Sequence, residues 1–199
     1  MPGFETKIAL GSANFGQDYG LRNEGGRISK VQFEQILLEA EQAGIEIIDT
    51  AQAYGDSEAR IGSFCNGERF KIVTKIGVDL EKEYGPNSFT KLVTDSCNRL
   101  NQSRLYAVML HRPELLFSDY RAFIIDELQT LKVQNKVSKI GVSIYSPTIL
   151  NEITKIMDLD IVQVPFNIFD QRILSSGWAE KLVNNNTEIH TRSVFLQGH

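Results

Sequence analysis

The chain is short of cysteine, proline and tryptophan, and it has no long apolar run. Its 199 residues include two cysteines, five prolines and one tryptophan. Cys65 and Cys97 lack the CxxC spacing of a redox or metal motif, so we expect two buried thiols rather than a disulfide framework. No apolar stretch approaches the length of a membrane span, and the N-terminus has no charged segment followed by an apolar one. These absences predict a cytoplasmic protein with no membrane partner and no signal peptide.

The chain also lacks an excess of positive charge. Lysine and arginine number 21 against 25 aspartates and glutamates, so the formal net charge is −4. Nucleic-acid-binding domains carry a basic surface, and we therefore expect no nucleic-acid partner. The sequence contains no GxSxG, HExxH, P-loop or GxGxxG motif. It therefore indicates no serine hydrolase, no zinc peptidase, no bound metal and no Rossmann dinucleotide site.

What the chain does have is a regular alternation of apolar and amphipathic segments. Short apolar segments predict seven strands, at residues 7–16, 45–49, 70–77, 105–111, 138–145, 160–167 and 188–198. Apolar residues at helical spacing predict helices between them, at residues 29–44, 56–67, 87–101, 120–136, 146–157 and 175–186. Ser29 and Gln32 fit a capping box at the start of the first helix, and Gly44 suits its end.

This alternation indicates an α/β fold. Strands that are apolar on both faces and alternate with helices predict a parallel sheet with helices outside it. Seven such units suit either an open doubly wound sheet or about seven of the eight units of a TIM (β/α)8 barrel. No linker or low-complexity tract divides residues 1–199, so we expect a single domain. The non-periodic segments 17–28 and 78–87 each follow a strand, where a barrel carries its working loops.

Polar residues follow the apolar strands at their C-terminal ends. Four strands lead directly into Asp49, Lys75, His111 and Ser143, and Gln163 lies within the next strand. Taken singly, each has an ordinary structural explanation, such as a helix cap, a lysine that reaches water or a buried structural histidine. In a parallel barrel these strand ends meet at one mouth, so we expect a site there.

An aspartate, a lysine, a tyrosine and a histidine at one mouth can protonate a carbonyl oxygen. A phenol has a pKa of about 10, and a nearby ammonium favours its ionised form. A buried lysine keeps its charge beside a carboxylate, which Asp49 would supply to Lys75. In this scheme Tyr54 is the proton donor, and a neutral His111 orients the carbonyl through a hydrogen bond.

Five segments of the chain resemble aldo-keto reductases, in the order of that family: DTAQAYGDSE, VTKIG, MLHRP, GVSIYSP and VQVPFNIFDQR. The resemblance covers almost the whole chain. It implies a (β/α)8 barrel that uses NADPH, less often NADH, to reduce aldehydes and ketones. It also implies a catalytic tetrad made of Asp49, Tyr54, Lys75 and His111. In that tetrad Tyr54 is the general acid, Lys75 adjusts its pKa and Asp49 pairs with Lys75.

The resemblance further implies contacts to the cofactor. Ser143 and Gln163 match residues that hydrogen-bond the nicotinamide carboxamide. Arg192 falls where the family often has an aromatic residue that stacks on the nicotinamide, and an arginine plane can stack too. Two positions depart from the family pattern. Ile144 stands where many members have an asparagine that contacts the carboxamide. Asn135 replaces a glycine in the turn before the fifth strand, where asparagine tolerates a left-handed backbone.

The third departure is the end of the sequence at His199. A barrel of this family continues with another helix, an eighth strand and its helix, which carry most contacts to the cofactor phosphates. We therefore expect an incomplete barrel whose exposed strand edges favour self-association. The leading interpretation is an NAD(P)H-dependent reductase of a small-molecule carbonyl substrate. The alternative is a truncated relative, weakly active or inactive, with a binding or assembly role. A third interpretation, another barrel enzyme with a lysine base, fits the position of Tyr54 poorly.

Overall fold

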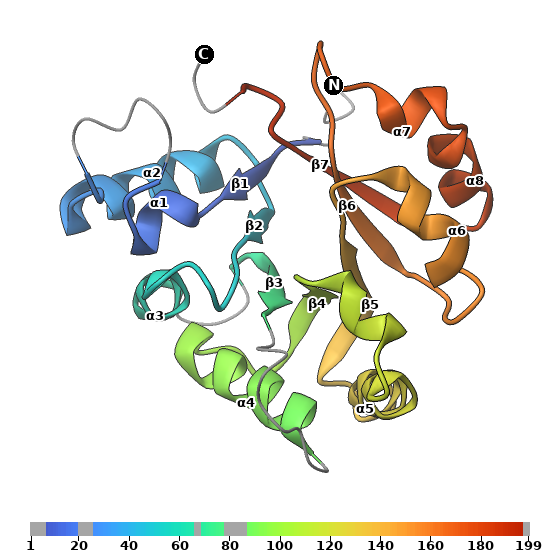
Figure 1. The fold of residues 1–199 in the computed structure, drawn as a ribbon. Coiled ribbons are helices and arrows are strands. Elements are labelled where there is room, and N and C mark those ends of the chain that lie inside the picture. Colours follow the sequence, from blue (N-terminus) through green and yellow to red (C-terminus); the bar gives the residue numbers. More distant parts are fainter. Residues whose placement is uncertain (1–6, 20–25, 66–68, 78–86, 197–199) are drawn as a thin grey trace, which may run out of the picture.

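The computed structural model describes residues 7–19, 26–65, 69–77 and 87–196. Its framework is one sheet of seven parallel strands that pair in the order of the chain. The strands are β1 (Ala9–Gly11), β2 (Ile47–Asp49), β3 (Lys71–Ile76), β4 (Leu105–Leu110), β5 (Val137–Ser143), β6 (Ile161–Pro165) and β7 (Glu188–Arg192). The sheet curls, and the helices lie outside it (Figure 1). This is the (β/α)8-type arrangement that the sequence predicts, with seven strands in the described residues.

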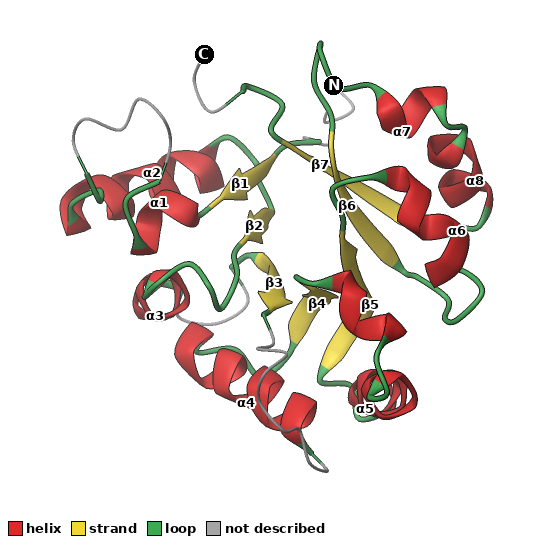
Figure 2. Cartoon of the chain, viewed as in Figure 1, coloured by secondary structure: helices red, strands yellow, loops and turns green. Residues whose placement is uncertain are grey.

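Helices follow the strands in the predicted alternation (Figure 2). They are α1 (Ala13–Gly16), α2 (Lys30–Gln42), α3 (Ser57–Phe64), α4 (Ser88–Leu100), α5 (Arg121–Val133), α6 (Leu150–Ile153), α7 (Arg172–Ser175) and α8 (Trp178–Asn184), with 3-10 turns η1 (Pro113–Phe117) and η2 (Pro147–Ile149). The capping box of α2 is confirmed. Ser29 Oγ accepts a hydrogen bond from the N–H of Gln32 at 3.3 Å, and Gln32 Oε1 accepts one from the N–H of Ser29 at 3.0 Å. Gly44 follows this helix with a φ of 74°, which glycine adopts without strain.

Most predicted elements end within a few residues of the expected positions, and three differ more clearly in the structure. The first strand ends at Gly11, and residues 13–16 of the predicted strand form α1 instead. The predicted helix over residues 146–157 begins as the 3-10 turn η2, and α6 covers only its middle. The last strand stops at Arg192 rather than at residue 198, because Ser193 takes a left-handed φ of 61° that ends an extended segment. Gly67 and parts of both long loops lie outside the described residues.

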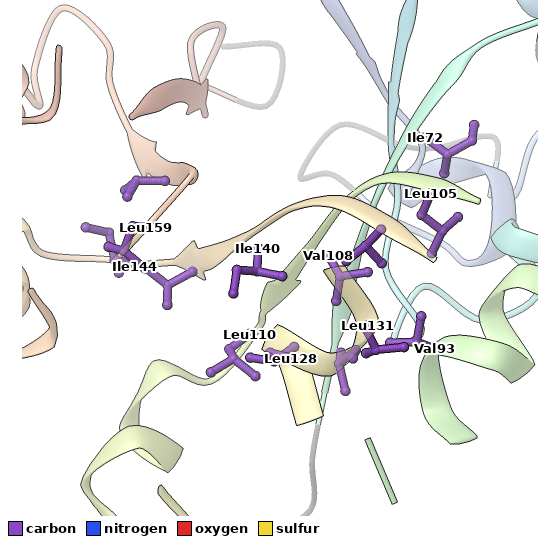
Figure 3. Packing of buried hydrophobic residues seen from close by; sticks show 14 of the residues in the cluster. Ile72, Val93, Leu105, Val108, Leu110, Leu128, Leu131, Ile140, Ile144 and Leu159 are labelled. Carbon is purple, nitrogen blue, oxygen red and sulfur yellow. The ribbon is translucent and has the colours of Figure 1, made fainter. Parts of the chain in front are cut away.

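Two groups of buried apolar side chains hold the sheet in place. The larger group lies between the sheet and the helices and includes Val108 and Ile140 from the strands and Leu128 and Leu131 from α5 (Figure 3). The smaller group consists of Val73, Ala107, Met109 and Ile161. Side chains alternate between the two faces of a strand, so the smaller group faces the inside of the curl.

Two smaller expectations, on the cysteines and on Asn135, are also met. Cys65 and Cys97 are free and buried, at the end of α3 and within α4. Asn135 has a φ of 57°, the left-handed conformation that asparagine tolerates. In the part of the chain that the structure describes, no helix has both the length and the apolar character needed to cross a membrane.

The parallel register brings the strand ends together at one mouth. Lys75 pairs with Met109 on the next strand, and Ser143 pairs with Gln163. Because neighbouring strands run in the same direction, their C-terminal residues share one edge of the curled sheet. Among the described residues β1 pairs only with β2 and β7 only with β6, so each of these two strands has an unpaired edge.

Candidate active site

A buried lysine–aspartate pair forms the centre of the site. β2 ends at Asp49, β3 carries Lys75, and Lys75 Nζ lies 2.6 Å from Asp49 Oδ1. Lys75 Nζ also donates to the carbonyl oxygen of Thr50 at 3.0 Å. The lysine side chain is 1% exposed, and burial lowers the pKa of Lys75 while the charge of Asp49 opposes that change. A buried ammonium needs such a partner to stay charged, so the two residues act as a unit.

Tyr54 is held in the loop between β2 and α3. Its N–H donates to the carbonyl oxygen of Ala51 at 3.0 Å, and its own carbonyl accepts from the N–H of Ser57 at 3.0 Å. α1 packs against this loop at Gly16, where a Cβ would lie 1.8 Å from the carbonyl oxygen of Tyr54. Only glycine permits that approach. These contacts hold the phenol beside the buried pair, with Lys75 Nζ 5.1 Å from the centre of the Tyr54 ring.

His111 joins the group from the strand beyond Lys75. It follows β4 directly, and its N–H donates to the carbonyl oxygen of Ile76 at 2.9 Å. Its ring stands edge to face with the Tyr54 ring, with centroids 6.0 Å apart and planes at 85°. Burial lowers the pKa of His111, and the positive charge of Lys75 lowers it further. His111 is therefore neutral near pH 7 and can donate one ring N–H.

The acidity of Tyr54 differs from the expectation. From the sequence we expect Lys75 to favour the ionised form of Tyr54, whereas the net direction of the pKa shift in the structure is the opposite. The pKa of Tyr54 is raised, because the phenol is buried and because the negative charge of Asp49 is near, whereas Arg192 acts in the opposite direction. The Lys75 charge is paired with Asp49, and the negative charge of Asp49 opposes the effect of the ammonium on the phenol. Tyr54 thus keeps its proton at neutral pH.

Ser143 and Gln163 reach the same group from β5 and β6. They pair in register, and Ser143 Oγ donates to Gln163 Oε1 at 3.2 Å. Gln163 Nε2 donates to Asp49 Oδ2 at 2.7 Å. The two residues are 5% and 4% exposed. The sequence predicts that both residues lie at this mouth. It does not predict the contact of Gln163 with Asp49, because no local pattern encodes a contact between residues 114 positions apart.

Arg192 lies at the rim of the mouth. It ends β7, donates from Nη2 to the carbonyl oxygen of Ile144 at 3.2 Å, and its guanidinium stacks 4.2 Å from the centre of the Tyr145 ring. Its charge lowers the pKa of Lys75 and opposes the rise in the pKa of Tyr54. Ile144 is fully buried in the outer core, so its side chain offers the mouth no polar group.

The polar groups at the mouth fit a nicotinamide carboxamide. Such a group needs a donor for its oxygen and an acceptor for its amide N–H, which Ser143 Oγ and Gln163 Oε1 can supply. Outside these groups, Asn14 in α1, three residues after β1, has a buried amide oxygen with no hydrogen-bond partner among the described residues. Buried acceptors are normally paired, so this oxygen is an exception in the described part of the chain.

The fold and the site together define the class of protein. A curled parallel sheet with outer helices, and with ionisable side chains at the C-terminal ends of its strands, has the arrangement of a (β/α)8-type barrel, with about seven of the eight units present. The chain belongs to the aldo/keto reductase family, whose model matches residues 7–199.

Individual relatives agree with this assignment. The chain is similar to D-arabinose 1-dehydrogenase of Saccharomyces cerevisiae, with 30% identity over 149 residues that cover 70% of this chain and 43% of the relative. It is similar to NADH-specific methylglyoxal reductase of Escherichia coli, with 28% identity over 156 residues that cover 68% and 48%. A solved aldo-keto reductase of Klebsiella pneumoniae in complex with NADPH has the same fold, with a TM-score of 0.74 and 18% identity over 96% of this chain and 64% of that one. The chain spans about half the length of the curated relatives it matches.

Proposed function

We propose that the chain carries the reducing site of an NAD(P)H-dependent oxidoreductase that converts a small aldehyde or ketone to an alcohol. The observation that carries the proposal is the convergence of Asp49, Lys75, Tyr54 and His111 at one mouth. A protonated acid, a neutral hydrogen-bond donor and a buried cation suit proton transfer to a carbonyl oxygen. Membership of the aldo/keto reductase family supports the same reaction class.

In the proposed reaction Tyr54 is the general acid. When bound, a reduced nicotinamide supplies a hydride to the carbonyl carbon. His111 orients the substrate by donating a hydrogen bond to the carbonyl oxygen, and Tyr54 transfers its phenolic proton to that oxygen. The phenol O–H bond breaks as the alcohol O–H bond forms. The Lys75 ammonium, held charged by Asp49, stabilises the phenolate that is left until a proton returns to it.

Three of the described residues would hold the nicotinamide end of NADPH or NADH. Ser143 and Gln163 would hydrogen-bond the carboxamide, and Arg192 would stack on the ring. The Escherichia coli relative is named for NADH and the Klebsiella pneumoniae structure contains NADPH, which supports a nicotinamide cofactor of either kind. Within the described ranges no group of three or more His, Cys, Asp or Glu side chains is arranged to hold a metal ion.

The proposal is tested by replacing the acid and titrating the cofactor. Tyr54→Phe removes the transferable proton, so we predict that kcat falls at least about a hundredfold. The affinity for NADPH, followed by its own fluorescence, and the thermal midpoint should stay unchanged. Tyr120→Phe changes a half-buried tyrosine at the start of α5 that packs against the outer core, so it is the matched control and should keep its turnover.

Two results would count against the proposal. Wild-type turnover in Tyr54→Phe would remove Tyr54 from the role of acid. Failure of the 199-residue chain to bind either NADPH or NADH would remove the reductase function from this chain.

A second candidate function is binding or assembly through the open edges of the sheet. The observation that favours it is the unpaired edge of β1 and of β7 among the described residues. An exposed strand edge presents backbone donors and acceptors on which another strand can add. The two candidates are compatible, since the edges and the mouth are different parts of the sheet.

A further inference from the structure

One hydrogen bond crosses the inside of the curled sheet. Gln163 Nε2 donates to Asp49 Oδ2 at 2.7 Å. Asp49 lies on β2 and Gln163 on β6, four strands further along the sheet. Adjacent strands are about 4.8 Å apart, so four steps along a flat sheet would span about 19 Å. The two side chains meet because the sheet curls.

This bond and the ion pair together occupy both oxygens of Asp49. Oδ1 accepts from Lys75 at 2.6 Å, and Oδ2 accepts from Gln163. An ionised carboxylate can only accept hydrogen bonds, so the amide of Gln163 must turn its Nε2 toward Asp49. Its Oε1 then faces Ser143, which donates to it at 3.2 Å. The result is a continuous hydrogen-bonded chain from Ser143 through Gln163 and Asp49 to Lys75.

We propose that Gln163 is a positioning residue that shares Asp49 with Lys75 and so links the carboxamide site to the proton-donating group. The inference rests on the proposed function, because it takes Ser143 and Gln163 as the place where the nicotinamide carboxamide binds. The amide of Gln163 makes both contacts. Its Oε1 accepts from Ser143 in the expected carboxamide site, and its Nε2 donates to Asp49. Hydrogen bonds in such a chain strengthen or weaken one another, so a change at one end is felt at the other.

Lys75 is the group at which this influence can be measured. The charged and titratable groups around it are Asp49 on β2, Tyr54 in the following loop, His111 after β4 and Arg192 at the end of β7. Gln163 itself does not ionise. A neutral replacement of Gln163 that moves the titration of Lys75 therefore acts through Asp49.

The first measurement is an NMR titration of the Lys75 side chain in the cofactor-free protein. Gln163→Met keeps the size of the side chain and removes its donor. Asp49 then accepts from Lys75 alone and holds the ammonium proton more tightly, so we expect the pKa of Lys75 to rise by about half a pH unit. Ser143→Ala is the matched control. It leaves the bond between Gln163 and Asp49 in place and should give a smaller shift.

A second variant keeps the proposal testable if Gln163→Met does not fold. Gln163→Glu keeps the shape of glutamine but places a second carboxylate beside Asp49, which should raise the pKa of Lys75 further. Circular dichroism establishes which variants are folded. A Lys75 titration that stays unchanged in the folded Gln163 variants overturns the positioning role.

The second measurement adds saturating NADPH. We expect it to shift the Lys75 titration in the unsubstituted protein and to leave Gln163→Met unshifted. Equal shifts in both proteins would overturn the link through Gln163. If NADPH does not bind at all, the proposed function fails, whereas the cofactor-free titration still decides whether Gln163 positions Asp49.

Discussion

We expect the protonation of His111 to set the acid limit of the proposed reaction. Its pKa is lowered by burial and by the charge of Lys75, so the neutral ring persists to a pH below the usual value of about 6.5. Protonation below that pH adds a second positive charge beside Lys75 and changes the hydrogen bonds that the ring offers.

We predict an acid limb in the pH profile of kcat below about pH 6.5 that depends on His111. His111→Gln keeps an N–H donor that does not titrate, so the limb should disappear while kcat at neutral pH falls by roughly tenfold or more. The control is His190→Gln on β7, which should retain the limb. An identical acid limb in His111→Gln would assign it to another group.

At the residue scale, the sequence predicted which side chains meet better than how they influence one another. Asp49, Lys75 and His111 could be found because each follows an apolar strand, and parallel strands end at one edge. The direction of the pKa shift of Tyr54 could not be predicted, since it depends on how deeply the phenol is buried. The sharing of Asp49 with Gln163 depends on the amount of curl, which no local pattern encodes.

A buried glutamate ties three elements together behind the site. Glu58 at the start of α3 is 2% exposed. It accepts from Thr74 Oγ1 on β3 at 2.6 Å and, on α4, from Arg99 Nε at 2.7 Å and Ser96 Oγ at 3.3 Å. Thr74 precedes Lys75, so this network anchors the strand that carries the buried ammonium.

We predict that Glu58→Ala lowers the free energy of unfolding by about 3 kcal/mol, because it leaves buried donors and a partly buried guanidinium without their acceptor. The control is Glu34→Ala, which removes an exposed ion pair with Lys30 at 3.7 Å and should cost under about 0.5 kcal/mol. Urea denaturation measures both. Equal losses would show that the Glu58 network does not stabilise the sheet.

A second network joins the strands on the inside of the curl. Glu188 on β7 accepts from Tyr106 at 2.7 Å, lies 2.6 Å from His190 Nε2, and also accepts from Lys139 on β5. Burial alone would raise the pKa of Glu188, yet the hydrogen bonds from Lys139, Tyr106 and His190 hold it at about 2. The folded protein thus binds this proton more weakly than the unfolded chain, whose glutamates titrate near about 4.3.

The sign of the pH dependence follows from that difference. The stabilisation is fully present above about pH 4.3 and is lost as the pH falls toward 2. We predict that Glu188→Gln costs about 1 kcal/mol at pH 7, a modest value because the group is partly exposed, and that it flattens the fall in stability between pH 5 and pH 2. Thermal midpoints across this range provide the measurement. A variant as acid-sensitive as the unsubstituted protein would exclude Glu188 as the cause.

At the element scale, the bounds that could be predicted were those set by local chemistry. The capping box of Ser29 and Gln32 and the left-handed Asn135 depend on neighbours in sequence, and both are confirmed. The early end of β7 could not be predicted, because Ser193 takes a left-handed conformation that serine rarely adopts. The alternation of apolar strands and amphipathic helices sets the whole architecture, and the sequence pattern predicts it along the chain.

The molecule as a whole has a sheet with two edges in its described part. β7 uses its even-numbered residues to bond β6, as in the contacts of Glu188 with Asp160 and of Arg192 with Phe166. In a parallel ladder the intervening residues point their backbone groups the other way. The N–H and C=O of Ile189 and Thr191 therefore face the unpaired edge.

We predict that the chain self-associates in a concentration-dependent way through this edge. Thr191→Pro removes one edge N–H without breaking the pairing of β7 with β6, so it should shift the population toward monomer. Thr191→Ala keeps the N–H and is the control. Sedimentation velocity over a range of concentrations distinguishes the cases, and a chain that is monomeric throughout would rule out assembly through this edge.

The bond between Asp49 and Gln163 also has a consequence for the order of events during synthesis. Every strand pairing in the sheet joins consecutive strands, so the sheet can extend step by step as each unit leaves the ribosome. The ion pair joins residues only 26 positions apart and can form early, whereas the bond to Gln163 must wait for the sixth strand. Contacts of such long sequence separation form late, because a long loop must first be closed. A nascent chain arrested before residue 163 could therefore hold the lysine–aspartate pair but not the bond from Gln163, which forms only once the sheet has curled.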